Sequence, residues 1–474
     1  MDKDAYIRHL QEENTALKER VAMLEKRIET LEKHIEELER LLGMNSRNSS
    51  KPPSSDPPGI STVLPKRRHK KRGARNGHQP HLKKLLPPSM VKQRFELKPE
   101  VCTCGSTNLE QTCEEPLRHQ IVDIPPIEPQ VTEYVQYIYR CKDCGELIYQ
   151  PLPDELKRKH FGPGTLSVVG MLTGFLNTSK RKALAIINEV FSVPMSLGGL
   201  SNCEAQLTDV LEQPYNETAE HVREQDVGHA DETGWPRANK QKGWLWTFCC
   251  VTAAFFMVHA NRSQQAARKL MGNFSGKLVS DRYNAYNFYK LIRQICWSHL
   301  KRDFKAISEG KGSIGKTGQE LYGLAKKILK LRKRVRDGTL QWRTFQNRMP
   351  PLMGRVEELL EQEAKGKCSL SGKCRRIIKH RKHLWTFVYD KSVEPTNNLA
   401  ERIVRQAVLW RKSSFGTQSE RGAHYVERIL TVCATCRLQS RSIIGYLREA
   451  CNCHLKGIPA PSLIGSEAGL VKSN

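Results

Sequence analysis

The segment from Gln225 to Phe304 constrains the fold most, because it contains several short β-rich runs and one short helical pattern. The β-rich runs cover residues 226–235, 244–251, 255–259 and 276–281, and the helical pattern covers residues 264–271. Runs of this length that are rich in aromatic and β-branched residues predict strands. The expected order is β-β-β-α-β, with Asp231 closing the first strand, Asp281 closing the fourth, and a fifth strand over residues 291–297.

Two aspartates at the ends of neighbouring strands could share a pair of divalent cations, which lie about 3.5–4 Å apart in two-metal nucleases. A third carboxylate has to come from elsewhere in the chain. Glu401 is a candidate, because it follows an Asn pair where a helix is predicted to begin. The same spacing also permits a structural role, since Asn398 and Glu401 fit a capping box and Glu401 and Arg405 fit an i,i+4 ion pair.

Four motifs in this part of the chain resemble the catalytic region of the insertion sequence 66 family of bacterial transposases. They are Asp231-Glu-Thr, Asp281-Arg-Tyr-Asn-Ala-Tyr286, Cys296-Trp-Ser-His299-Leu-Lys-Arg302 and Asn397-Asn-Leu-Ala-Glu401-Arg. Upstream, residues 48–56 are similar to a signature that precedes the zinc-binding segment in that family. The resemblance implies a ribonuclease-H-like core with a DDE triad of Asp231, Asp281 and Glu401, which would bind two Mg²⁺ ions.

One position departs from the family pattern. Family members often have aspartate before the Asn pair, whereas this chain has Thr396, and Glu394 lies nearby. Glu394 precedes Pro395 and so lies outside the predicted helix. Glu401 is the predicted third ligand, because a helical residue is held more rigidly.

The composition indicates a nucleic-acid-binding protein. The 474 residues are too many for one ordinary domain, and 77 Lys and Arg against 50 Asp and Glu give a net charge of +27 and a pI near 9.6, which favours nucleic acid as partner. The resemblance implies that this partner is double-stranded DNA. There is no run of about 18 apolar residues and no signal-peptide pattern, so we expect a cytoplasmic protein with no membrane partner. An odd count of 15 cysteines favours reduced thiols and metal ligands over disulfides.

Residues 1–44 carry a heptad repeat typical of a leucine-zipper coiled coil. The d positions are Leu10, Leu17, Leu24, Leu31 and Leu38, and the a positions are Ile7, Asn14, Val21, Ile28, Ile35 and Leu42. β-branched residues at a with Leu at d favour a parallel homodimer, and the single polar residue Asn14 would fix its register. Charged pairs at the flanking positions, such as Glu13 with Lys18, agree with this register. The alternative is a solvated single helix.

Residues 45–88 are rich in Ser, Pro and basic side chains, and predict a disordered basic linker. Its cations are Lys66, Arg67, Arg68, Lys70, Lys71 and Arg72. On a DNA-binding protein they could contact phosphates, although such a run is often only a solvated tail.

Residues 89–160 predict a small zinc-finger domain of the zinc-ribbon type. Cys102, Cys104, Cys141 and Cys144 could form a tetrahedral Zn²⁺ site. The first pair is Cys-x-Cys, tighter than the usual Cys-x-x-Cys, and Cys113 could replace Cys102 as a ligand. A second set has similar spacing: Cys433, Cys436, Cys451 and Cys453. It lies on an apolar helix face, where free cysteine is commonly a small buried hydrophobe.

The other regions are predicted to be mainly helical. Residues 161–225 contain segments at 180–191 and 197–211 that fit either a helix-turn-helix or a helical bundle on the catalytic sheet. The catalytic domain is placed at residues 226–445, with a basic helical insertion at about 306–390 and a C-terminal tail from 446 to 474. The cations predicted to form a DNA-binding face near the metal site are Arg302, Arg402, Arg405, Arg411 and Lys412.

Together these patterns predict a multidomain α/β protein with a coiled coil, a zinc-ribbon-like segment, a helical domain and a ribonuclease-H-like core. The expected function is that of a DDE transposase, which cleaves transposon ends and joins their 3′ ends to target DNA by two-metal chemistry. The alternatives are a non-catalytic zipper and zinc-finger regulator, and a ribonuclease-H-like nuclease without strand transfer. The resemblance also implies accessory transposition proteins and a bacterial, nucleoid-associated location.

Overall fold

The computed structural model describes residues 3–46, 48–49, 56, 85–111, 117–153, 156, 160–310, 312–367 and 369–464. The chain divides into two compact units, Gly59–Pro129 on the one hand and Met1–Pro58 with Gln130–Asn474 on the other. The predicted basic cluster from Lys66 to Arg72 and the alternative ligand Cys113 lie outside the described residues.

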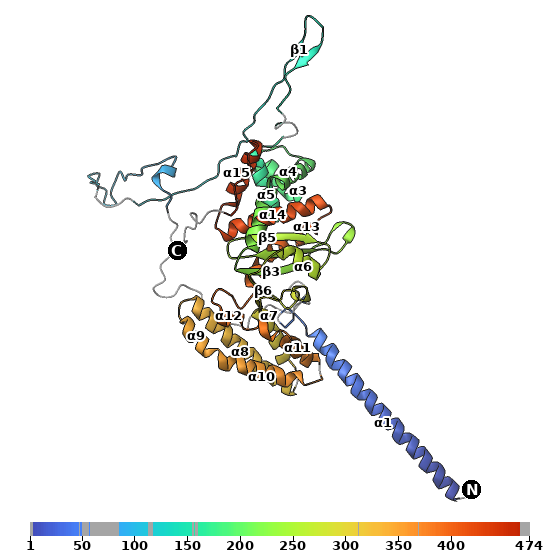
Figure 1. Cartoon of the computed structure of the whole chain (residues 1–474). Coiled ribbons are helices and arrows are strands. Elements are labelled where there is room, and N and C mark those ends of the chain that lie inside the picture. Colours follow the sequence, from blue (N-terminus) through green and yellow to red (C-terminus); the bar gives the residue numbers. More distant parts are fainter. Residues whose placement is uncertain are drawn as a thin grey trace. The chain divides into compact units, whose positions relative to one another are not determined.

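The N-terminal helix α1 spans Lys3–Leu42 and follows the heptad pattern (Figure 1). Its described a and d side chains are all exposed, for example Leu17 at 58% and Ile28 at 55%. A stripe of this kind on a single helix leaves apolar surface in water and has no partner within the described part of the chain. Among the described residues, no helix combines the length and the hydropathy that a bilayer span requires.

Short elements precede the main body of the chain. A 3₁₀ turn, η2, covers Pro88–Met90. Strands β1 (Ile138–Arg140) and β2 (Leu147–Tyr149) then form an antiparallel hairpin in which Ile138 pairs with Tyr149.

A five-stranded mixed sheet forms the centre of the main unit. Its strands are β3 (Val227–Gly234), β4 (Trp244–Cys249), β5 (Ala254–His259), β6 (Lys277–Ser280) and β7 (Arg293–Ile295), and their order is β5-β4-β3-β6-β7. The first three strands pair antiparallel, whereas β3–β6 and β6–β7 pair parallel. Helix α6 (Gln264–Met271) connects β5 to β6, so the element order agrees with the predicted β-β-β-α-β pattern.

Two strand limits were predicted wrongly. Asp231 does not close the first strand, because β3 continues to Gly234, where it still pairs with Trp244 of β4. Asp231 instead lies just beyond the last parallel pair of β3 with β6, His229 with Val279. The fifth strand is shorter than predicted, because Trp297 already begins helix α7 (Trp297–Ser308).

Helices cover both faces of the sheet. Trp246 and Phe248 of β4 pack with α6 residues on one face, while Leu245 and Cys249 alternate to the other face. That second face is covered by α13 (Asn398–Ser414) and α14 (Glu420–Leu438) (Figure 1). Further helices join its core: α2 (Pro163–Gly170), a π-helical turn (Met171–Phe175), α3 (Lys180–Val190), α4 (Leu197–Val210) and α15 (Ile443–Leu455). Helix α5 (Glu212–Arg223) instead buries Ala219 and Val222 in the core on the α6 face.

Helix α4, the second helix of the candidate helix-turn-helix, is packed rather than free. It buries Leu200, Cys203 and Leu207 completely in the core that it shares with α14. This is the contact expected from the bundle alternative.

Helices also follow β7 in sequence. They are α8 (Gly312–Arg336), α9 (Trp342–Arg348), α10 (Pro350–Ala364), α11 (Ser369–Ile378), η6 (Arg381–His383) and α12 (Thr386–Tyr389). With α7 they enclose an aromatic core that contains Trp297, Phe345 and Phe387, all fully buried. The indole N–H of Trp297 donates to the Leu384 carbonyl at 2.7 Å. This bond joins α7 to the connection between η6 and α12.

Helix α14 covers the edge of the sheet at β5. The backbone N–H groups of Ala254, Phe256 and Val258 donate to Thr435 Oγ1, Thr431 Oγ1 and Glu427 Oε1 at 3.1, 3.1 and 2.6 Å. Alternate strand residues therefore meet helix residues spaced four apart. The outward N–H groups of this edge strand are satisfied within the chain.

The second cysteine set behaves as buried apolar side chains. Cys433, Cys436 and Cys451 are at most 1% exposed, and burial raises the pKa of Cys436 to about 11 and of Cys451 to about 12. The burial of these three thiols agrees with the buried-thiol interpretation, whereas Cys453 is partly exposed.

Candidate active site

The sheet register brings Asp231 and Asp281 to matching positions. Val227 pairs with Lys277 and His229 with Val279, and the same register continued by two residues aligns Asp231 with Asp281, which directly follows β6. Asp231 also lies opposite Thr247 of β4. Thr247 is two residues from Leu245 and from Cys249 and lies on the same face as both, so Asp231 lies on the face of the sheet that α13 covers.

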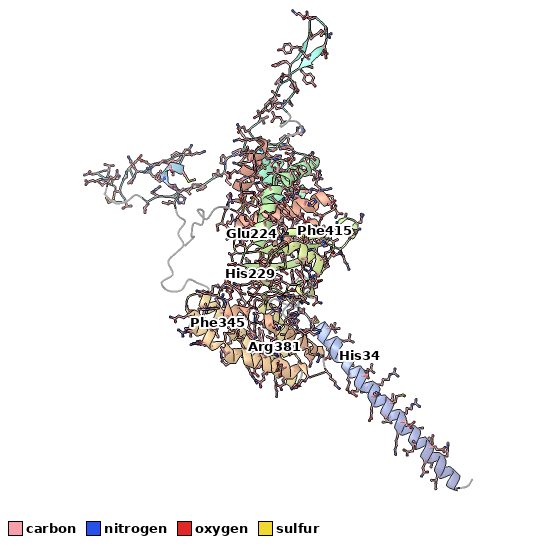
Figure 2. The ribbon with its side chains drawn as sticks, viewed as in Figure 1. His34, Glu224, His229, Phe345, Arg381 and Phe415 are labelled. Carbon is pink, nitrogen blue, oxygen red and sulfur yellow. The ribbon has the colours of Figure 1, made fainter. Side chains whose placement is uncertain are left out.

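Glu401 enters the site from the first turn of α13. The start of this helix is tied to β3 by Asn397, which is 1% exposed. Asn397 Nδ2 donates to the Ala230 carbonyl at 2.8 Å, and its Oδ1 lies 3.2 Å from His229 Nδ1. His229 lies within the sheet (Figure 2). The side chain of Asn397 thus holds the start of α13 against the residue next to Asp231.

The structural alternative for Glu401 does not hold. Asn398 is the first residue of α13 rather than its cap, and its Oδ1 accepts a hydrogen bond from Ser298 Oγ at 3.1 Å. Among the described residues there is neither a capping-box bond nor an ion pair from Glu401 to Arg405. Glu394 has a different partner, because its Oε1 lies 3.2 Å from the buried guanidinium of Arg332.

The carboxylates perturb one another electrostatically. Burial, followed by the charges of Glu232, Asp281 and Glu401, raises the pKa of Asp231 well above its usual value. Glu232, on the opposite face of the strand, has its own cation: Arg262 Nη2 lies 2.6 Å from Glu232 Oε1, and the Tyr286 hydroxyl donates to Glu232 Oε2. Within the described part of the chain, Asp231 and Asp281 have no such ion pair.

Cys296 and His299 approach Glu401 most closely. Cys296 Sγ lies 3.7 Å and His299 Nδ1 lies 3.6 Å from Glu401 Oε1. Their ligand atoms all lie within 4.8 Å of one another, and Asp231 and Asp281 do not join this group. Burial raises the pKa of Cys296 to about 12, so its thiol donates to the carboxylate; burial lowers the pKa of His299.

A large basic cavity opens beside Asp281, with a volume of about 1000 Å³. Asp281 is its single acidic lining residue. The cationic side chains that line it are Arg262, Arg282, Lys290, Arg293, Arg376, Lys379 and Lys382, with His299, His380 and His383 among them. Burial, then Arg293 and Arg282, lowers the pKa of His380 to about 4, so its imidazole is neutral at pH 7. A polyanion would be attracted to this cavity.

The cations named from the sequence occupy different environments. Arg402, Arg405 and Lys412 are exposed on α13, and Arg302 is partly buried on α7. Arg411 donates to Thr233 Oγ1 at 3.2 Å and to the Gly234 carbonyl, so it anchors α13 to the end of β3.

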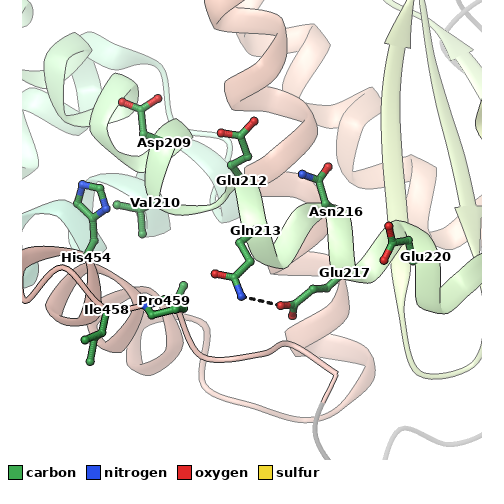
Figure 3. Close-up of a pocket in the computed structure, with 11 residues that line it drawn as sticks. Asp209, Val210, Glu212, Gln213, Asn216, Glu217, Glu220, His454, Ile458 and Pro459 are labelled. Carbon is green, nitrogen blue, oxygen red and sulfur yellow. Dashed lines mark hydrogen bonds between the residues drawn. The ribbon is translucent and has the colours of Figure 1, made fainter.

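A second cavity, of about 430 Å³, has the opposite charge. It is lined by α5 residues such as Glu212, Glu217 and Glu220, and by His454 of α15 (Figure 3). Gln213 Nε2 donates to Glu217 Oε1 at 2.8 Å. The acidic lining makes this cavity unsuited to DNA phosphates.

Each pair of candidate zinc ligands lies on a tight turn. Gly105 N–H donates to the Cys102 carbonyl at 2.8 Å and Gly145 N–H to the Cys141 carbonyl at 2.9 Å, and both glycines have positive φ angles, +87° and +77°. The pKa of Cys102 is lowered by hydrogen bonds from the backbone and side chain of Cys104, and that of Cys141 by backbone N–H groups, first that of Cys144. Both turns therefore favour thiolates, the form that binds zinc.

The sequence analysis missed several residues of the site. Cys296 and His299 belong to a motif that it quoted but gave no role, and Asn397 was noted only as part of a helix start. The cavity cations on the segment between β6 and β7, on α11 and on η6 were not considered, because they are far apart in sequence. The Asn pair and the Cys-x-x-His spacing were the available signals.

Comparison with known proteins relates three regions of the chain to family models. Residues 180–425 match the model described as "Transposase IS66 family", residues 99–145 match "zinc-finger binding domain of transposase IS66", and residues 3–84 match a family of unknown function (DUF6444).

Similar proteins occur in Sinorhizobium fredii. The uncharacterized protein y4hP is 24% identical over 401 residues, which cover 75% of this chain and 71% of that protein. The uncharacterized protein y4jD is 21% identical over 398 residues, 77% of each chain. Because the transposase model matches residues 180–425, just over half of the 474 residues, the chain belongs to the IS66 family of transposases.

Proposed function

We propose that this chain is a DDE transposase whose triad is Asp231, Asp281 and Glu401. The observation that supports the proposal is the proximity of the three carboxylates: besides burial, the charges of Asp281 and Glu401 contribute to the raised pKa of Asp231. The register of β3 and β6 aligns the two aspartates, and Asn397 fixes the helix of Glu401 to the same strand. The strand order, with three antiparallel strands followed by two parallel ones, supports the ribonuclease-H-like core that the sequence resemblance implies.

The donor set fits a pair of Mg²⁺ ions. Carboxylate oxygens are the ligands that Mg²⁺ prefers. Burial, followed by the charges of neighbouring carboxylates, raises the pKa of Asp231, which has no ion pair within the described site. The chemistry that such a bound pair supplies is activation of the nucleophile and stabilisation of the leaving oxygen in phosphodiester cleavage. Asp231, Asp281 and Glu401 would hold the pair, and bound cations would favour the ionised form of Asp231.

The basic cavity beside Asp281 supports DNA as the substrate. Lys290, Lys379 and Lys382 are exposed on its lining and can contact successive phosphates of one strand, which would place a phosphodiester near the carboxylates. Arg402, Arg405 and Lys412 extend the positive surface along α13, and Arg302 lies on the neighbouring helix α7. The linker cations from Lys66 to Arg72 would add contacts that do not depend on base sequence.

The reaction we infer has two steps at one site. Water first attacks the phosphodiester at a transposon end and frees a 3′-hydroxyl, which then attacks a phosphodiester of the target DNA. No covalent enzyme intermediate is needed. The exposed apolar stripe of α1 supports a parallel homodimer that could hold two ends together, and Cys102, Cys104, Cys141 and Cys144 would bind one Zn²⁺. Accessory proteins and action at the bacterial nucleoid are part of this proposal.

The test compares Glu401→Gln with Glu394→Ala on a labelled transposon end in Mg²⁺. Glutamine keeps the shape of Glu401 but is a much poorer Mg²⁺ ligand, so Glu401→Gln should abolish cleavage and joining while DNA binding persists. Glu394→Ala should retain activity, because Glu394 pairs with Arg332 instead.

An active Glu401→Gln protein with an inactive Glu394→Ala protein would overturn the triad assignment. Cleavage by the wild type without joining to target DNA would indicate a nuclease, and binding without any cleavage would indicate a regulator.

A further inference from the structure

We propose that Cys296, His299 and Glu401 form a binding site for Zn²⁺ or a similarly soft divalent cation, and that its occupation inhibits the enzyme by withdrawing Glu401 from the Mg²⁺ pair. Binding at this site is independent of the proposed reaction. The inhibitory consequence rests on the proposed role of Glu401.

The distances fit a tetrahedral zinc centre. Glu401 Oε1 lies 3.7 Å from Cys296 Sγ and 3.6 Å from His299 Nδ1. In a tetrahedral site with zinc–sulfur bonds of about 2.3 Å and zinc–nitrogen and zinc–oxygen bonds of about 2.0–2.2 Å, ligand atoms are roughly 3.3–3.6 Å apart. Two of the three separations therefore already lie close to zinc geometry. The third, between the ligand atoms of Cys296 and His299, is within 4.8 Å and would shorten as both side chains turn toward an ion.

The fold fixes the three ligands on two joined helix starts. Cys296 directly precedes α7 and His299 lies in its first turn, whereas Glu401 lies in the first turn of α13. The two starts are bonded to each other, because Trp297 N–H donates to the Pro395 carbonyl at 2.8 Å and Asn397 N–H donates to Cys296 Sγ at 3.1 Å. Ligands on rigid elements with such support are preorganised for a metal.

His299 supplies an independent sign that a ligand belongs here. Its Nδ1 atom is buried and, among the residues that the structure describes, has no hydrogen-bond partner, although it lies 3.6 Å from Glu401 Oε1. Buried polar atoms without a partner are rare in native structures and call for an unseen ion, water or functional role. Coordination by a cation would satisfy this atom.

The ligand chemistry selects the metal. A sulfur, a nitrogen and an oxygen donor suit zinc, whereas Mg²⁺ prefers an all-oxygen octahedron. His299 also lines the basic cavity, so a water molecule from that side can complete the coordination of the ion. The site shares no residue with Cys102, Cys104, Cys141 and Cys144.

Zinc content of the full chain tests the binding. Wild type, Cys296→Ser and His299→Gln are equilibrated under reducing conditions at one fixed micromolar free Zn²⁺ concentration, and bound zinc is measured by elemental analysis. Each variant should bind about one equivalent less than the wild type. Any zinc at the zinc-finger cysteines contributes equally to all three proteins and cancels in the comparison.

The matched control is Cys433→Ser, which removes an equally buried thiol on α14 and should bind as much zinc as the wild type. Cys296 is fully buried, so Cys296→Ser could lose zinc by misfolding. His299 is partly exposed, and His299→Gln is therefore expected to fold. The melting temperature of each protein is measured to check this. Equal zinc content in the wild type and in a folded His299→Gln protein overturns the proposal.

Cleavage assays separate this inference from the proposed function. Micromolar Zn²⁺ should inhibit Mg²⁺-dependent cleavage by the wild type, and His299→Gln, measured against its own zinc-free rate, should need at least about tenfold more zinc. If zinc binds at Cys296 and His299 but the wild type never cleaves DNA, the proposed function fails and the metal site stands. If the wild type cleaves DNA and the variants lose no zinc, the metal site fails and the function stands.

Discussion

Replacing Thr431 with valine should destabilise the sheet, because Thr431 completes the edge strand β5. Its Oγ1 accepts the Phe256 N–H at 3.1 Å and donates to the Glu427 carbonyl at 2.7 Å, and the residue is fully buried. Valine keeps the shape but offers no acceptor. An orphaned buried N–H costs about 1–3 kcal/mol, which for a domain of this size lowers the melting temperature by roughly 2–12 °C.

The measurement is thermal unfolding of the wild type and the variant, with amide hydrogen exchange at Phe256 as a local readout. Thr218→Val is the matched control. Thr218 is also fully buried and also donates to the carbonyl four residues earlier, Pro214, at 2.6 Å, but it accepts no strand N–H among the described hydrogen bonds. If both variants melt within about 1 °C of each other, the cover on the β5 edge contributes nothing and the reasoning fails.

Three other predictions follow from the site and from the N-terminal regions. The folded-state pKa of Asp231 is raised above its ordinary value of 3.8, so the free energy of unfolding of the metal-free protein falls as pH rises above that value. Asp231→Asn should therefore have a higher melting temperature than the wild type at pH 8 and the same melting temperature near pH 4. The same difference in melting temperature at both pH values would contradict this. A fragment of residues 3–42 should form a parallel dimer, which Asn14→Leu makes more stable and less specific in register; cross-linking that shows antiparallel or monomeric chains would refute it. Cys141→Ser should bind about one equivalent of zinc less than the wild type, whereas Cys436→Ser should bind as much as the wild type. Less than about half an equivalent of zinc per wild-type chain would refute zinc binding by these cysteines.

The elements of the sheet could be predicted from the sequence because their signals are local. The aromatic runs of β4 and β5 and the helical pattern of α6 each lie within ten residues. The end of β3 could not be predicted, because it is set by pairing with β4 as far as Gly234, and only the folded sheet shows how far that pairing extends. The position of Asp231 within its strand was wrong for this reason.

The candidate site was predicted in part for a similar reason. The two aspartates and Glu401 follow recognisable local patterns, although their joint role stays a proposal. The contacts of Cys296 and His299 with Glu401 link residues about one hundred positions apart, and no spacing rule in the sequence connects them. The basic cavity likewise combines Lys290 with Lys379 and Lys382, which only the packing of the helices against the sheet brings together.

The link from Asn397 to β3 has a consequence for protein synthesis. The side chain of Asn397 contacts His229, which lies 168 positions earlier in the chain, and Ala230, which lies 167 positions earlier. A ribosome adds about 5–20 residues per second, so it needs roughly 8–34 s to synthesise the residues between β3 and Asn397. During this time β3 lacks its contact with α13. A product of a gene copy interrupted before this codon would keep α1 and both aspartates but lack Glu401. Under the proposed dimer and triad, such a truncated chain would pair with intact chains without cutting DNA, and broken copies of the element would thereby inhibit the complete one.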